Sequence, residues 1–171
     1  MFATYGGPFT RPFFSRRIGL AFDSSTGQYI QNRIIYGARL SGNVTNKWRV
    51  GLLNMQGAAD DEIALPSYNY TVAAAQRRVG SNSNIRGLFI NKQDFQNSDD
   101  YDRVIGGDYN YNFKSNKYTG SVYYHQQLNN QFKGHELDSG LFSHGFDFNY
   151  NTPELRASYY HTIVGIIITH K

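Results

Sequence analysis

The stretches Gly107-Asp108-Tyr109-Asn110-Tyr111-Asn112 and Gly145-Phe146-Asp147-Phe148-Asn149-Tyr150-Asn151 share one pattern, in which aromatic side chains alternate strictly with Asp or Asn. After a short polar turn, each is followed by a second alternating stretch, Tyr118–His125 and Leu155–His161 respectively. Successive side chains of an extended strand point to opposite faces of a sheet. Each pattern therefore predicts a β-hairpin with one aromatic face and one polar face.

The same signals predict four hairpins between residues 34 and 163. They pair Ile34–Asn43 with Trp48–Met55, Tyr68–Arg78 with Asn84–Lys92, Tyr101–Phe113 with Lys117–Leu128, and Leu141–Asn151 with Glu154–Ile163. The turns within hairpins are short, whereas the connections between them are longer: Gln56–Ser67, Gln93–Asp100 and Asn129–Gly140. No segment has the apolar period of an amphipathic helix. We therefore expect an all-β fold, an antiparallel up-and-down meander of about eight strands.

An aromatic face opposite an Asp/Asn face is typical of transmembrane β-barrels, which contact lipid outside and water inside, and which alternate short turns with long loops. A soluble sandwich also alternates, with the aromatic face as its core, and alternation alone does not separate the two. The Asn/Asp face and the connection lengths favour the barrel. We expect part of an outer-membrane β-barrel, located in the cell outer membrane with membrane lipid as its partner.

If the chain is a barrel segment, its polar face lines the lumen. The candidate lumen residues are Arg39, Arg49, Asp108, Asn110, Asn112, Ser121, Asp147, Asn149, Asn151 and Arg156. The faces of the strand Asn84–Lys92 are ambiguous, because Leu88, Phe89 and Ile90 are contiguous apolar residues.

The organisation expected along the chain has three parts: an irregular segment over residues 1–33, the barrel segment over residues 34–163 and an atypical tail over residues 164–171. No secretion signal is visible at the start, so we expect a fragment of a longer exported protein. The 171 residues include no Cys, which excludes a disulfide scaffold and zinc–thiolate chemistry. The net charge of +4 comes from scattered Lys and Arg, so no nucleic-acid partner is expected.

Several segments in a fixed order carry a family resemblance: Phe13–Gly19, Tyr36–Gly42 with Trp48–Asn54, Asn69–Val72 with Gln76–Arg78, Ile85–Lys92 and Tyr101–Asp108. Together they resemble the C-terminal region of domain-of-unknown-function family 5916, from bacteria with an outer membrane. The resemblance implies a predicted outer-membrane barrel that follows an N-terminal sandwich similar to family 9 carbohydrate-binding modules. That sandwich, absent from this chain, is the part for which the resemblance implies carbohydrate as a partner.

The sequence contains no convincing catalytic constellation. Asp108 and Asp147 could be drawn as a glycosidase pair, but their equivalent repeat positions indicate lumen residues. His125 and His161 end equivalent strands without a third placed ligand, so polar rim histidines are favoured over a metal pair. We expect no catalytic residue, metal site or cofactor in this chain.

The expected role is structural or transport-related, with a lumen that binds or passes a polar ligand. Two alternatives stay open, a carbohydrate-active envelope hydrolase and a soluble sugar-binding β-domain. Whether the parent protein is an enzyme is not decided by these residues.

Overall fold

The chain folds into β-strands in a computed structural model that describes residues 18–23, 25–129 and 137–170. Ten strands occur in these ranges: β1 (Leu20–Asp23), β2 (Gln28–Gln31), β3 (Ile34–Asn43), β4 (Trp48–Gly57), β5 (Tyr68–Val79), β6 (Ser83–Asp94), β7 (Tyr101–Phe113), β8 (Tyr118–Asn129), β9 (Leu137–Asn151) and β10 (Arg156–His170). The described residues contain no helix, and so none that is long and apolar enough to cross a membrane. The expected all-β class is confirmed.

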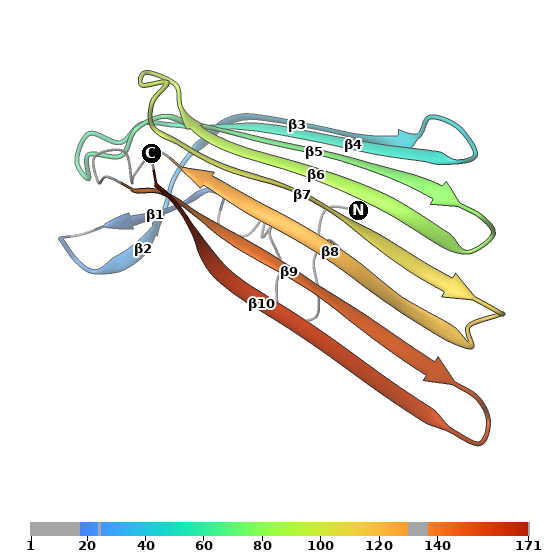
Figure 1. Cartoon of the computed structure of the whole chain (residues 1–171). Helices are drawn as coiled ribbons and strands as arrows, with labels where there is room; N and C mark the ends of the chain where they lie inside the picture. Colours follow the sequence, from blue (N-terminus) through green and yellow to red (C-terminus); the bar gives the residue numbers. More distant parts are fainter. Residues whose placement is uncertain (1–17, 24, 130–136, 171) are drawn as a thin grey trace.

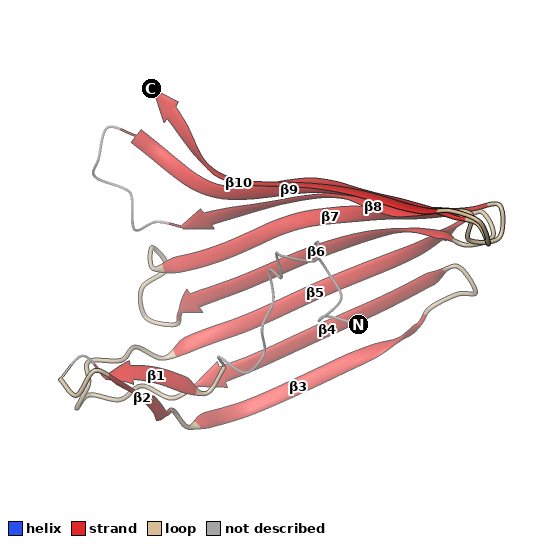
Figure 2. Cartoon of the chain, turned by 90° about the horizontal axis from the view of Figure 1, so that it is seen from below, coloured by secondary structure: helices blue, strands red, loops and turns tan. Residues whose placement is uncertain are grey.

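Strands β3 to β10 form one antiparallel sheet in which each strand is bonded to its sequence neighbours. The expected eight-strand meander is therefore confirmed. The sheet curves into an open trough, with the short turns at one end and the long connections at the other (Figures 1 and 2). It is not closed, because β3 and β10 each pair on one side only.

Two segments form β-strands that the sequence pattern did not predict. Within residues 1–33, β1 and β2 form a separate two-stranded hairpin beside the long-connection end of the sheet (Figure 1). The expected tail over residues 164–171 instead continues β10 as far as His170, with Val164 paired to Ser143 and Thr169 to Asp138. Three consecutive isoleucines from Ile166 favour an extended backbone, since β-branched residues fit a pleated sheet. Lys171 lies outside the described residues.

The two faces of the sheet differ in exposure. Large apolar side chains of one face remain accessible: Val122 is 52% exposed, Ile105 52% and Phe146 41%. The other face, on the concave side of the trough, is more buried and carries most of the polar side chains. It also contains an apolar cluster of Val72, Ala74 and Leu88, with Leu53 and Ile90 packed against it.

This cluster resolves the ambiguous strand β6. Phe89 pairs with Ala73 and Ile105 in the convex rows, whereas Leu88 lies opposite Ala74 and belongs to the concave cluster. The contiguous apolar residues therefore serve both faces at once. The concave face is apolar at its middle and polar toward the short turns.

Aromatic rings lie over four glycines of the described sheet: Gly106, Gly120, Gly145 and Gly165. A Cβ atom added at Gly120 would overlap the carbonyl oxygen of Asp147 and the hydroxyl of Tyr111, and one at Gly145 would lie 2.8 Å from the hydroxyl of Tyr123. At Gly106 the ring of His125 occupies the same space. Glycine within a strand marks a close approach of this kind. These positions let long side chains lie flat across neighbouring strands.

We predict that Gly120→Ala lowers the free energy of unfolding by about 1–3 kcal/mol, because the added methyl group meets backbone that must shift. Gly87→Ala is the matched control, since no atom lies within 4 Å of its added Cβ. The measurement is the urea midpoint followed by the fluorescence of Trp48, the single tryptophan. Equal midpoints for both variants would contradict the close approach at Gly120.

Candidate functional site

A row of polar residues runs straight across the concave face near the short turns. Arg78 lies opposite Asn84, Asn84 opposite Asn110, Asn110 opposite Ser121, and Ser121 opposite Asp147. Directly opposed side chains on one face have Cβ atoms about 4.5–5.5 Å apart. The five strands β5 to β9 therefore present a continuous polar surface.

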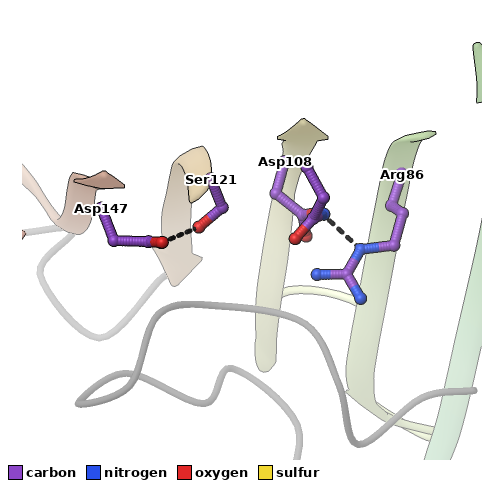
Figure 3. Close-up of polar contacts among 5 residues, drawn as sticks. Arg86, Asp108, Ser121 and Asp147 are labelled. Atoms are coloured by element: carbon purple, nitrogen blue, oxygen red, sulfur yellow. Dashed lines mark hydrogen bonds and ion pairs between the residues drawn. The ribbon is translucent and has the colours of Figure 1, made fainter. Parts of the chain in front are cut away.

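The charged centre of this surface is the pair Arg86 and Asp108, from the adjacent row. Arg86 Nε donates to Asp108 Oδ1 at 2.5 Å, with side-chain exposures of 12% and 1% respectively (Figure 3). The Asn110 amide donates to the same oxygen at 2.5 Å. Two charges withdrawn this far from water are tolerated only when they are paired and hydrogen-bonded.

A second group of contacts surrounds Asp147 on β9. Its carboxylate accepts a hydrogen bond from the Ser121 hydroxyl (Figure 3). It accepts another, at 3.2 Å, from the Asn149 amide. Its backbone carbonyl accepts a hydrogen bond at 2.9 Å from the hydroxyl of Tyr111, the ring that lies over Gly120. The carboxylate is thus oriented by neighbours on its own strand and on β8.

These residues line an open groove with a volume of about 350 Å³. Its lining is rich in residues with amide, hydroxyl and carboxylate groups: Asn82, Asn110, Tyr111, Asn112, Thr119, Gly120, Ser121, Asp147 and Asn149. A second groove of about 610 Å³ shares Asn82 and Asn112 with it and extends to Gln76 and Arg78. The combined surface suits a polar solute that offers and accepts hydrogen bonds.

His125 is a buried member of the concave face and does not lie at its rim. Its ring packs against Tyr123 at 5.7 Å between centroids and covers Gly106. Within the described residues, both ring nitrogens and Asp108 Oδ2 are buried without a hydrogen-bond partner. Such atoms ordinarily bond water or a solute, so they mark where the network is incomplete.

No metal centre forms in the described part of the chain, where no three His, Cys, Asp or Glu side chains are grouped suitably. His161 pairs with Phe146 on the convex face, opposite to the face of His125, so these histidines do not meet. In the long connections, Asp100 accepts a hydrogen bond from the hydroxyl of Tyr68 at 2.8 Å. The carboxylate of Asp100 therefore stabilises local structure in its connection.

The structure gathers some of the sequence-predicted lumen residues and separates others. Asp108, Asn110, Asn112, Ser121, Asp147 and Asn149 lie together on β7 to β9. The remaining four are Asn151 and Arg156 beside the β9–β10 turn, and the exposed Arg39 and Arg49 on β3 and β4. Ser15, Arg16 and Arg17, considered as a pre-barrel anchor, lie outside the described residues.

Sequence reasoning missed Arg86, the partner of Asp108, because the contiguous Leu88, Phe89 and Ile90 obscured the faces of β6. A signal was present: Asn84 and Arg86 alternate with Ile85 and Gly87, in the same phase that Asp108 shows on β7. Strand-by-strand alternation, carried through the ambiguous segment, would have placed Arg86 on the polar face.

Comparisons of the chain with protein-family models, curated proteins and solved structures found no match.

We predict that Asp108→Ala lowers the free energy of unfolding by about 3–5 kcal/mol, because it leaves a buried guanidinium without its carboxylate. The double variant Arg86→Met/Asp108→Leu removes both charges and should cost less than the single variant. Chemical denaturation gives the free energy of unfolding of both variants and so tests which of them is the more stable. A double variant less stable than Asp108→Ala would show that Arg86 and Asp108 are not each other's principal partners.

Proposed function

We propose that this chain forms part of an outer-membrane β-barrel, with the concave face lining a lumen that passes or binds a polar solute. The observation that supports this most is the distribution of polarity. The apolar face is convex and exposed, while the ion pair and the Asp147 contacts lie on the concave face. A barrel in lipid has this arrangement, with apolar residues outside and polar residues inside.

The exposed apolar surface is large. Along β9 its convex residues are Phe142, His144, Phe146, Phe148 and Tyr150. At about 3.4 Å per residue, this stretch is about 27 Å long, close to the roughly 25 Å apolar band of barrels in membranes. Soluble proteins rarely expose contiguous apolar patches above a few hundred Å².

A polar row bounds the apolar surface on the side of the long connections. Over β4 to β7 it consists of Asn54, Thr71, Asn91 and Arg103, which oppose one another on the convex face. Asn54 donates to Thr71 at 2.8 Å, and Arg103 donates to Asn91 at 2.8 Å. This row shortens the apolar stretch on β4 to β6 and supports a membrane boundary at this height.

The soluble-sandwich alternative requires a second layer over the aromatic face. The described strands supply none, since the other sheet is only the short β1–β2 hairpin. A hydrolase in this chain is also less well supported, because Asp108 and Asp147 are each engaged by neighbouring side chains. The resemblance to family 5916 agrees with a barrel and stays a prediction.

Cell fractionation tests the proposed location directly. We predict that the protein expressed from its complete gene fractionates with the outer membrane. Closed barrels commonly resist unfolding in detergent until heated, so its gel mobility should change on boiling. Recovery as a monomer in detergent-free buffer, with a cooperative thermal transition, would overturn the proposal.

Two adjacent substitutions on β8 test the assignment of the faces. We predict that Val122→Arg impairs membrane insertion by about 2–4 kcal/mol, the cost of a charge facing lipid near the midplane. Ser121→Arg is the control, because its side chain would project beside the Asp147 carboxylate on the concave face. The readout is the fraction with heat-dependent mobility after refolding into vesicles. Equal losses for both variants would show that the faces are assigned wrongly.

A further inference from the structure

The two ends of the sheet differ in charge. The turns at one end contain Lys47, Lys114 and Lys117 against the single acid Glu154. At the other end, the described connections, residues 32–33, 58–67 and 95–100, contain five acids and one cation, Arg33. Among the described connections, the short-turn end is therefore basic and the opposite end acidic.

On the convex face, the basic side chains of the short-turn end lie against aromatic rings. Arg77 lies over Trp48, with the guanidinium carbon 5.5 Å from the ring centroid. Lys117 Nζ lies 5.8 Å from the Tyr118 centroid and 5.3 Å from that of Tyr150, and Lys114 Nζ lies 5.8 Å from Tyr118. We call this group the basic collar; its members are Trp48, Arg77, Lys114, Lys117, Tyr118 and Tyr150.

The collar occupies one edge of the apolar surface. Tyr118 and Tyr150 oppose each other, and the next convex rows along the strands contain Phe148 and then Val122 with Phe146. Aromatic residues with a polar atom favour the boundary between hydrocarbon and headgroups. Long basic side chains can place their charge among the headgroups while their stems cover apolar surface.

The opposite edge of the apolar surface has a different chemistry. Its convex row is built from neutral side chains and one cation, Arg103, which donates to Asn91 and Gln93. Among the described residues of the convex face, the short-turn edge thus presents more cations toward the surroundings of the sheet than the opposite edge over β4 to β7. Its charge is complementary to an anionic headgroup layer and not to a zwitterionic one.

We propose that the basic collar binds the headgroups of anionic phospholipids, which sets the orientation of the sheet with its short turns in an anionic leaflet. This inference rests on the proposed membrane location and adds to it the class of lipid and the surface that binds it. Basic residues close to an anionic membrane surface each strengthen binding by an amount equivalent to about fivefold.

The test compares refolding of the protein expressed from its complete gene into vesicles of phosphatidylcholine, with and without phosphatidylglycerol. Flotation measures association, and gel mobility without heating measures insertion. We expect tighter association with the phosphatidylglycerol vesicles, and we expect salt to reduce the difference by screening. Lys114→Gln/Lys117→Gln should weaken the phosphatidylglycerol association by about 25-fold, at two lysines of about fivefold each.

Lys92→Gln is the control for net charge. Lys92 Nζ also lies over a tyrosine ring, 3.9 Å from the centroid of Tyr68, but on the concave face and toward the long-connection end. Its replacement should leave the phosphatidylglycerol preference unchanged. A loss of about fivefold for this single lysine would show a net-charge effect and overturn the collar.

The remaining outcomes separate the collar from the proposed function. Insertion that is the same with and without phosphatidylglycerol would overturn the collar and leave the membrane location standing. Failure of the unsubstituted chain to associate with either kind of vesicle would overturn the proposed location, and the collar with it.

Discussion

The register of the eight-stranded sheet decides which side chains share each face, and every other feature depends on it. From β4 to β10 the pairing proceeds without a shift; the one irregularity lies between Ile34 and Tyr36 at the start of β3. Because side chains alternate with a period of two, a slip of one residue would move Asp108 and Asp147 to the convex face and their aromatic neighbours to the concave face. The short turns hold this register, for instance through the bond from Lys117 N to Lys114 O at 3.1 Å.

Polarity and curvature support one another in this arrangement. On the concave side of a curved sheet, side chains converge, so that Arg86 reaches Asp108 and Ser121 reaches Asp147 across adjacent strands. On the convex side, side chains diverge and many rings stay exposed. Rings lie flat over glycines on both faces, as Tyr111 does over Gly120 on the convex face and His125 over Gly106 on the concave face.

Much of the fold followed from alternation, and the failures have physical causes. The bounds of Ile34–Asn43 and Tyr101–Phe113 agree with β3 and β7, because their side chains alternate cleanly. The β1–β2 hairpin was missed because strands of four residues carry too little periodicity. At the site, Asp108 and Asp147 were predicted to lie on the same face. Arg86 was missed because the contiguous apolar residues of β6 obscured its alternation. The buried state of His125 was missed because it depends on neighbours that only strand pairing brings close.

The two unpaired edges of the sheet limit how the chain could insert into a membrane. All ten residues of β3 are exposed, and β10 pairs only with β9. An unpaired backbone N–H or C=O group in hydrocarbon costs several kcal/mol, because lipid offers no replacement for water. A row of such groups along each edge would cost far more than burial of the convex apolar face could offset. Membrane insertion therefore requires that both edges pair, with further strands or with each other, and the curvature of the trough brings them toward closure.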